Sequence, residues 1–307
     1  MFAGHLPVLL QETLRLLSPA PGEVFLDGTA GAGGHAAEIA RRIGPRGILV
    51  CADADPGMLS VAAERLQGLP AVRLVHADYA DLPRLREAAG GLPFHGMLLD
   101  LGISSLQLDD PSRGFSFRED GPLDMRRDPG EPVPTARDIL RKAREKDLAD
   151  LFYRFGEERF SRRIARAVVS ERQRGPIDRT LQLADLVKRT IPRKAWPRDI
   201  HPATRVFQAL RIAVNRELES LSEFLEGFAP HLAKDGRVAI ISFHSLEDRL
   251  VKTAFRAQST GEHAVLTVMT RKPVVPGEDE IRENPRARSA KLRAARRREQ
   301  EESACNE

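Results

Sequence analysis

The feature that most constrains the fold is a glycine-rich turn near the N-terminus, where residues 25–35 read Phe-Leu-Asp-Gly-Thr-Ala-Gly-Ala-Gly-Gly-His. An apolar run ends in Asp27, four glycines follow within residues 28–34, and a helical pattern of apolar residues begins directly afterwards. Glycine permits positive φ and a close approach of the backbone to a ligand. The first N–H groups of a helix have no partner within it. The sequence therefore predicts a strand, a loop and a helix that together bind a nucleotide-like cofactor.

Two classes of cofactor fit this loop, and a turn with no ligand is the third interpretation. Residues 31–36 match the dinucleotide fingerprint with alanine last, and Asp53 lies about 20 residues beyond the loop, where a ribose-binding acid is expected. S-adenosylmethionine fits Asp27 better, because a carboxylate repels a pyrophosphate but attracts the ammonium of the methionine moiety. We therefore favour the methyl donor and keep an NAD-dependent oxidoreductase as the alternative.

The composition narrows the class of protein. At 307 residues, 41% of them apolar, the chain can hold one large or two modest domains with a real core. Cys51 and Cys305 cannot form a disulfide framework and indicate free thiols in a reducing compartment. The chain has no CxxC or HExxH pattern, so we expect no metal site. No long apolar run or signal segment is evident, so we expect a soluble, cytoplasmic protein without membrane contact.

Strand-like apolar runs alternate with helical patterns over the first hundred residues. The runs cover 24–27, 48–53, 72–78 and 96–101, and the acids at or near their ends are Asp27, Asp53, Asp78 and Asp100. This alternation predicts a parallel sheet covered by helices on both faces, with a ligand beyond the carboxyl ends of the strands. One such acid is more often a helix cap. Four in register beside the glycine loop favour a binding site.

The alternation stops after Asp100. Residues 104–134 are rich in Gly, Pro, Asp and Arg, and a charged helical pattern continues to about residue 190. A long helix is predicted from Ala203 to about Leu232, followed by strands at 236–244, 264–270 and 289–295, of which the last two form an antiparallel hairpin. We predict an α/β fold with a Rossmann-like class I methyltransferase sheet, mostly parallel. Residues 1–108 and 207–307 form its S-adenosylmethionine-binding domain, and residues 109–206 an inserted, mainly helical substrate-recognition domain.

The predicted strand ends suggest how an acceptor is held. Methyl transfer is an in-line displacement, so the protein mainly aligns the acceptor and accommodates its proton. Asp53 is placed for the ribose hydroxyls of the donor, and Tyr79 for its adenine. Hydrogen bonds from a cytosine amine to Asp100 would localise the nitrogen lone pair. The two prolines and the aromatic residue that often follow such an acid are absent after Asp100. A stacking partner for the base is therefore needed elsewhere, and the candidates are Phe115, Phe117 and Phe243.

Blocks of sequence that follow one another along nearly the whole chain carry a resemblance. They are His5-Leu-Pro-Val-Leu, residues 27–35, Asp100-Leu-Gly-Ile-Ser-Ser, Arg113-Gly-Phe-Ser-Phe, Asp120-Gly-Pro-Leu-Asp-Met-Arg, Gly156-Glu-Glu-Arg-Phe, His201-Pro-Ala-Thr-Arg, Ser242-Phe-His-Ser-Leu-Glu-Asp and Asn284-Pro-Arg-Ala-Arg-Ser. Together they resemble the bacterial ribosomal RNA small-subunit methyltransferases that modify cytosine N4. The match runs from His5 to Arg296.

The resemblance implies a set of site residues and partners. It implies S-adenosylmethionine contacts at Gly33, Gly34, His35, Asp53, Tyr79, Asp100 and Gln107, to which the charge argument for the loop adds Asp27. It implies a cytidine in the decoding region of small-subunit ribosomal RNA as acceptor, in the assembled subunit. The resemblance gives no catalytic base, so Asp100, with His244 or Ser242 beside it, is a hypothesis from the strand ends. A non-catalytic ribosome assembly factor is a further alternative, and a homodimer stays open.

Two basic clusters predict contact with RNA. Residues 284–298 hold seven Arg or Lys and no acid, and Arg162, Arg163 and Arg166 form a second cluster. Such groups neutralise phosphates, so binding should weaken steeply with salt. A solvated charged face is the alternative interpretation. We expect the helical insert to dock the RNA, and a flipped or looped-out base to provide specificity.

Overall fold

The computed structural model describes residues 7–69 and 71–299, so His5 and Cys305 lie outside the described residues. The chain divides into two compact units. Unit 1 comprises the residues up to Gly102 together with those from Leu218 onward, and unit 2 comprises Ile103–Glu217. The predicted domain bounds at 109–206 remain a prediction, because compactness alone does not say which residues act together.

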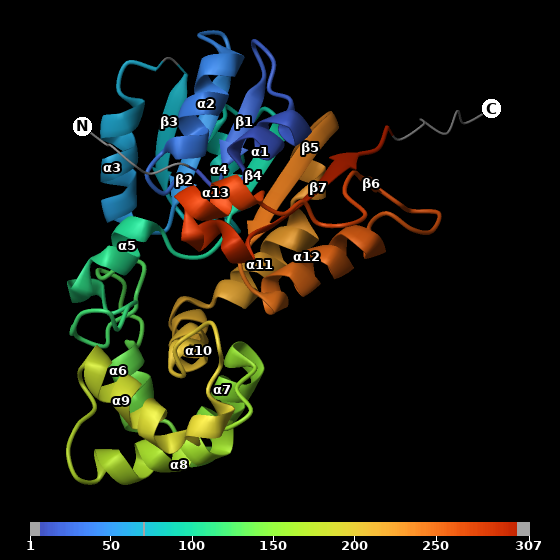
Figure 1. Ribbon diagram of the computed structural model, residues 1–307. Helices are drawn as coiled ribbons and strands as arrows, with labels where there is room; N and C mark the ends of the chain where they lie inside the picture. The colour runs from blue at the N-terminus through green and yellow to red at the C-terminus, as the bar shows by residue number, and fades with distance from the viewer. Residues whose placement is uncertain (1–6, 70, 300–307) are drawn as a thin grey trace. The chain divides into compact units, whose positions relative to one another are not determined.

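Unit 1 is built on a sheet of seven strands (Figure 1). The strands are β1 (Val24–Asp27), β2 (Ile48–Asp53), β3 (Val72–His76), β4 (Phe94–Asp100), β5 (Leu232–Ser242), β6 (Leu266–Val268) and β7 (Lys291–Arg297). Their order is β3-β2-β1-β4-β5-β7-β6. The first five are parallel, and β7 runs antiparallel to both β5 and β6. The predicted fold class, a mostly parallel sheet with an antiparallel terminal hairpin, is confirmed.

Helices cover both faces of this sheet, because successive residues of its strands point to opposite faces and both sets are apolar. In β1, Val24 and Leu26 join one buried cluster and Phe25 joins the other. The face of Phe25 is covered by α1 (Leu10–Leu17), α2 (Gly34–Ile43) and α3 (Pro56–Leu66). The opposite face is covered by α4 (Leu82–Ala88), α11 (Glu217–Gly227) and α12 (Ser245–Ala257). A strand with no polar face is expected where a parallel sheet is buried on both sides.

The basic segment 284–298 is mainly an interior strand. It contains the short helix turn after α13 (Glu278–Glu283) and then β7, which lies between β5 and β6. Arg293 is only 6% exposed, and its Nε donates to Oδ1 of Asp248 at 2.6 Å. Arg296 Nη1 lies 3.3 Å from Oδ1 of Asp235. Arg293 is thus buried and paired, as an arginine inside a protein usually is, whereas Arg296 is paired at the surface.

Unit 2 is helical and has its own core. Its helices are α5 (Ser105–Asp109), α6 (Ala136–Lys142), α7 (Glu145–Gly156), α8 (Ser161–Arg172), α9 (Thr180–Thr190) and α10 (Thr204–Asn215). Side chains such as Leu140, Phe152 and Ile164 are fully or almost fully buried in this core. Thr135 and Asp138 form a capping box that begins α6. In the part of the chain that the structure describes, no helix has the length and apolar character needed to cross a bilayer.

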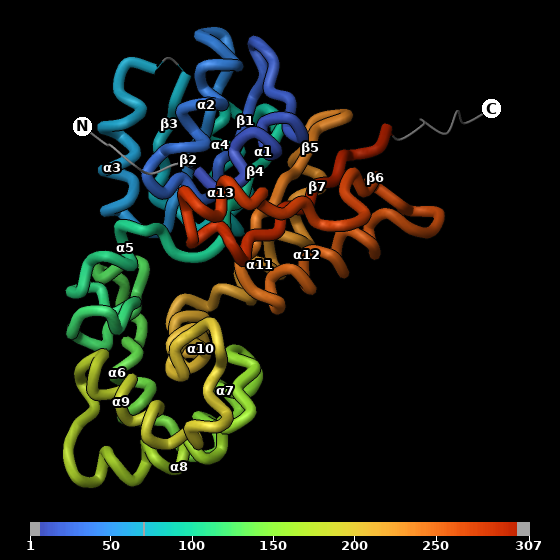
Figure 2. The backbone as a smooth tube through the Cα atoms, in the orientation of Figure 1, coloured from blue at the N-terminus to red at the C-terminus, as the bar shows by residue number. Residues whose placement is uncertain are grey.

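The single long helix predicted from Ala203 to about Leu232 is wrong. Two helices are present, because α10 ends at Asn215 and Arg216 adopts a left-handed conformation with φ 49° before α11 begins. A left-handed residue cannot continue the i→i−4 ladder. The Asn215 side chain instead donates to the carbonyl of Met125 at 2.8 Å and accepts from the N–H of Arg127 at 2.8 Å. The chain can be followed through this break in Figure 2.

Candidate active site

The glycine loop joins the end of β1 to the start of α2. Gly33 is the N-cap of α2 with φ 75°, and no side chain caps the helix. A Cβ on Gly34 would lie 2.5 Å from Cγ of Pro7, so this glycine also lets the N-terminal segment pack against the loop. Positive φ at Gly33 favours glycine over any residue with a Cβ. The uncapped first turn of α2 therefore offers its N–H groups and the positive end of its dipole to an anion.

Asp53, at the end of β2, fixes the shape of this loop. Its Oδ2 accepts from the N–H of Gly31 at 2.8 Å, and its Oδ1 accepts from the N–H of Asp55 at 2.9 Å. Asp55 in turn is the N-cap of α3. Each carboxylate oxygen has a second lone pair. The geometry thus leaves Asp53 able to accept hydrogen bonds from ribose hydroxyls while it holds the loop.

Thr29 ties the loop to the end of β4, where Asp100 lies. The N–H of Asp100 donates to Oγ1 of Thr29 at 2.6 Å, and the N–H of Thr29 donates to Oδ1 of Asp27 at 3.2 Å. Oδ1 of Asp100 is buried and has no hydrogen-bond partner among the described residues. A buried polar atom without a partner is unusual and calls for a ligand or a functional reason. The sequence did not single out Thr29, although it lies inside the conspicuous loop.

The surroundings of Asp27 and Asp100, at this edge of the sheet, disfavour the ionised form of their carboxyl groups. Burial, together with the nearby charges of Asp27 and Glu247, raises the pKa of Asp100 from 3.8 to about 8. Burial likewise raises the pKa of Asp27 to about 7, partly opposed by the N–H of Thr29 and reinforced by the charge of Asp53. Like charges and burial both disfavour ionised carboxylates. A cation bound here would offset this unfavourable energy.

His35 connects the same site to the N-terminal segment. It is 5% exposed, with Nε2 3.1 Å from the carbonyl oxygen of Val8 and Nδ1 3.7 Å from Oδ2 of Asp100. Burial lowers its pKa to about 4, so the imidazole is neutral at neutral pH. If Nε2 carries the proton and donates to Val8, Nδ1 faces Asp100 as an acceptor. His35 is therefore part of the surroundings of Asp100 and of the wall of the loop.

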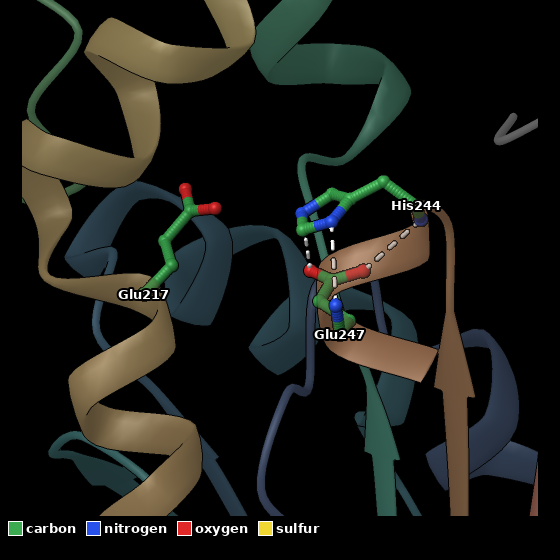
Figure 3. Close-up of side chains that lie close together, drawn as sticks. All are labelled: Glu217, His244 and Glu247. Carbon is green, nitrogen blue, oxygen red and sulfur yellow. Dashed lines mark hydrogen bonds and ion pairs between the residues drawn. The ribbon is translucent and has the colours of Figure 1, made fainter. Parts of the chain in front are cut away.

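His244 begins α12 and is fixed by Glu247 (Figure 3). Its Nδ1 accepts from the N–H of Glu247 at 3.4 Å, and its Nε2 lies 3.2 Å from Oε1 of the same residue. Oε2 of Glu247 accepts from the N–H of Phe243 at 2.9 Å. Glu217, also drawn in Figure 3, belongs to unit 2. Sequence reasoning missed Glu247, although an acid three residues after an N-cap is a known capping pattern.

Two predicted residues of unit 1 are buried in packing contacts. Ser242 is 2% exposed, and its Oγ donates to the carbonyl of Lys291 on β7 at 3.3 Å. Tyr79 is 3% exposed and packs edge-to-face against Phe224, with ring centroids 5.9 Å apart. Both side chains contribute to the packing of the sheet. A catalytic role for Ser242 and an adenine contact for Tyr79 stay predictions.

Other predicted residues belong to unit 2. Gln107 is 5% exposed in α5, and its Oε1 accepts from the N–H of Ser104 at 2.9 Å in a capping box. Phe115 is buried in the core of unit 2, and Phe117 packs against Phe207. Phe243, the third candidate for stacking a base, is half-buried against the sheet of unit 1. None of these aromatic positions was distinguished from core residues by the sequence.

Fold and site together define the class. The sheet is parallel except for β7, which lies antiparallel between β5 and β6. This sheet, with a glycine loop after β1 and acids at the ends of β1, β2 and β4, is typical of S-adenosylmethionine-dependent methyltransferases. The residues present fit the methyl donor. The uncapped start of α2 suits its carboxylate, and the unpartnered oxygen of Asp100 lies among acids that a cation would stabilise.

The chain belongs to the MraW methylase family, which matches residues 2–298. Ribosomal RNA small subunit methyltransferase H of Syntrophobacter fumaroxidans is 49% identical over 305 residues, covering 94% of this chain and 95% of that protein. The protein of the same name from Geobacter sulfurreducens is 48% identical over 309 residues, covering 96% and 99%. A solved rRNA methylase from Streptococcus thermophilus aligns over 94% of this chain and 95% of its own, with a TM-score of 0.43 and 11% identity. Family membership favours the methyl donor over the dinucleotide alternative.

Proposed function

We propose that this protein transfers a methyl group from S-adenosylmethionine to the N4 amine of a cytidine in the decoding region of 16S ribosomal RNA. Methylation of small-subunit ribosomal RNA follows from the family and from the names of relatives nearly half identical to this chain. The acceptor atom, the assembled small subunit as substrate and a cytoplasmic setting are the proposed refinements. The structural observation that carries the proposal is the half-buried carboxyl of Asp100 beside the glycine loop, whose Oδ1 is buried without a hydrogen-bond partner among the described residues.

The donor would be held by the edge of the sheet. We assign its carboxylate to the start of α2 at Gly33, Gly34 and His35, because no side chain caps the helix there; the N–H of Gly33 itself donates to the carbonyl of Ala30, so the N–H groups of Gly34 and His35 are the donors. We assign the ribose hydroxyls to Asp53, whose carboxylate has remaining acceptor capacity. Asp27 is only 1% exposed, so its part is to favour the cationic end of the donor electrostatically and to hold Thr29. Contacts of Tyr79 and Gln107 with the donor come from the family resemblance, and the place of Tyr79 after β3 assigns it to the adenine.

The acceptor amine would meet Asp100. Bound S-adenosylmethionine supplies a methyl group on a positively charged sulfur, which is already activated for transfer. An ionised Asp100 accepts a hydrogen bond from the amine, which localises the nitrogen lone pair, and takes up the proton that the amine loses as the N–C bond forms. The negative field of Asp27, Asp100 and Glu247 favours the positive charge that the reaction carries on the amine. His244 is placed as a neighbour whose ring Glu247 orients.

Methyl transfer from labelled donor tests the proposal. Unmodified small subunits and naked 16S RNA are incubated with the protein and labelled S-adenosylmethionine, and the digested RNA is analysed for modified nucleosides. Labelled N4-methylcytidine on the subunits is expected. Label on another nucleoside would contradict the acceptor assignment. Donor binding without any transfer would favour the assembly-factor alternative, and tight NAD binding without donor binding would favour the oxidoreductase. Light scattering of the same sample tests the homodimer.

A further inference from the structure

Unit 2 contains a pocket whose lining is dominated by arginine. Its volume is about 500 Å³, which lies within the range of roughly 300–1,000 Å³ seen for small-ligand sites. The lining comes from α6, from the end of α8 and from the segment 173–178 that follows it. Its charged members are Arg137, Arg141, Arg172, Arg174 and Asp178. Nη1 of Arg174 lies 3.9 Å from Oε2 of Glu171, so the positive charge that favours an anion comes mainly from Arg137, Arg141 and Arg172.

Arg172 builds the wall of this pocket. Its Nη1 donates to the carbonyl oxygens of Leu140 and Ala143, at 2.8 and 2.7 Å. The end of α8 is thereby fixed to the last turn of α6, whose final carbonyls have no partner within the helix. Leu140 and Ile177, which are 1% and 4% exposed, lie behind the cations as an apolar floor. Buried side chains and the hydrogen bonds of Arg172 therefore hold the pocket in shape.

Arg137 and Arg141 are exposed cations of α6, and the charge of Arg137 is partly offset by neighbouring Asp138. They are four residues apart and so share one face, where a like-charge pair destabilises the helix. Arg137 lies in the first turn, at the end of the helix that disfavours a cation. Both side chains are exposed, and neither has an ion-pair partner among the described residues. An anionic ligand would offset both the repulsion between the two arginines and the unfavourable position of Arg137 in the first turn of α6.

Neighbouring cations outside the pocket are arranged differently. Nζ of Lys142 lies 3.9 Å from Oδ1 of Asp138, and Nε of Arg144 lies 2.7 Å from Oδ2 of Asp147. Lys142 and Arg144 therefore give a matched comparison in the same stretch of sequence, in which each cation already has a carboxylate partner.

We propose that this pocket binds the phosphodiester backbone of the RNA substrate, with Arg137 and Arg141 on phosphate oxygens. The inference rests on the proposed function and adds to it where the RNA is held. Guanidinium groups match phosphate oxygens with two parallel hydrogen bonds, and their planes also stack on bases. The apolar floor at Leu140 and Ile177 suits a ribose or base attached to such a phosphate. The carboxylate of Asp178 is an acceptor for the 2′-hydroxyl.

Binding of a fluorescein-labelled single-stranded RNA to the full chain tests the pocket. The double variant Arg137→Gln/Arg141→Gln is compared with Lys142→Gln/Arg144→Gln, which loses the same charge within the same stretch of sequence. Anisotropy is measured between 50 and 200 mM salt. The pocket variant is expected to bind at least tenfold more weakly. Its salt slope should be smaller by about 1.4, because each phosphate that is no longer neutralised on a single strand lowers the slope by about 0.7. The control variant is expected to bind within threefold of wild type.

Methyl transfer to small subunits gives the second readout. The pocket variant is expected to raise KM for the subunits about tenfold, with kcat within twofold and donor binding unchanged. Equal losses in both variants, or RNA binding at the wild-type level in the pocket variant, would overturn the inference. Impaired transfer to subunits with unchanged binding of free RNA would overturn it as well, because the pocket would then meet a protein of the particle. If wild type transfers no methyl group, the proposed function fails, and the anisotropy still decides the pocket.

Discussion

The acids at the strand ends of unit 1 and the arginines of the unit 2 pocket are charged groups in opposite environments. Asp27 and Asp100 are crowded and poorly solvated, and burial raises the pKa of each to about 7 and about 8. Arg137 and Arg141 are exposed to solvent. The difference teaches that one protein can separate two electrostatic tasks. Chemistry in unit 1 should respond to pH, whereas recognition in unit 2 should respond to salt.

The largest effect is expected from Asp100→Asn. Because the amide cannot take up the proton of the amine, the single-turnover rate should fall about 10²- to 10⁴-fold, the usual range for general acid–base catalysis. Rapid-quench measurement of labelled transfer to saturating subunits gives this rate. Asp78→Asn is the matched control, since Asp78 also follows a strand, and its Oδ1 accepts from the N–H of Ala80 at 2.8 Å. A near-wild-type rate in Asp100→Asn would show that Asp100 does not take up the proton in the chemical step.

Donor affinity should depend next on Asp53. In Asp53→Ala the N–H of Gly31 loses its acceptor and the ribose loses a carboxylate. A hydrogen bond to a charged group contributes about 1.5–3 kcal/mol, so the Kd for S-adenosylmethionine should rise roughly 10- to 150-fold. Titration calorimetry measures it, with Glu64→Gln on the exposed face of α3 as control. An unchanged Kd would show that the loop binds the donor without this acid.

The same Asp100→Asn change should stabilise the protein in the absence of donor. The folded protein keeps the Asp100 proton up to about pH 8, whereas the unfolded chain loses it near pH 4. Wild type therefore loses stability as pH rises from about 4 to about 8, and the variant does not. We expect a gap of about 1–3 kcal/mol at pH 9, the order of a buried unsatisfied group, and little gap at pH 5. Urea unfolding at the two pH values measures it, and a wild type more stable than the variant at pH 9 would contradict the burial account.

A smaller effect is expected from Glu247→Gln. The change removes a charge that raises the pKa of Asp100 while keeping an oxygen that can accept from the N–H of Phe243. The pH–rate profile should therefore move to lower pH by a fraction of a unit, with less than a tenfold change in the maximal rate. A purely structural role for Glu247 would lower the rate without moving the midpoint.

The sequence predicts the sheet of unit 1 well, because its signals are local. Strand β2 has the predicted bounds, since a buried apolar run leaves a clear pattern. The place where Asp27, Asp53 and Asp100 meet also follows from the sequence. In a parallel sheet the carboxyl ends of strands lie at one edge.

What the sequence did not predict depends on long-range contacts. Arg216 has the propensity of a good helix residue, yet it ends α10 in a left-handed conformation. The basic run of β7 has the composition of an RNA-binding tail, yet Arg293 pairs with Asp248, 45 residues away in the chain. The pocket of unit 2 joins α6 to α8 through Arg172, which no periodicity reveals. Such pairings are chosen by packing, which a single sequence does not record.

The most direct test of the central claim is the single-turnover rate of methyl transfer to saturating small subunits, measured from pH 6 to pH 9 at two salt concentrations. The rate should rise with pH and level off at or below about pH 8, because the cationic donor favours ionised Asp100 and so lowers its pKa. Salt should raise the subunit concentration needed for saturation and leave the saturated rate almost unchanged. A saturated rate that ignores pH, or that falls with salt as steeply as RNA binding does, would contradict the division between the two units.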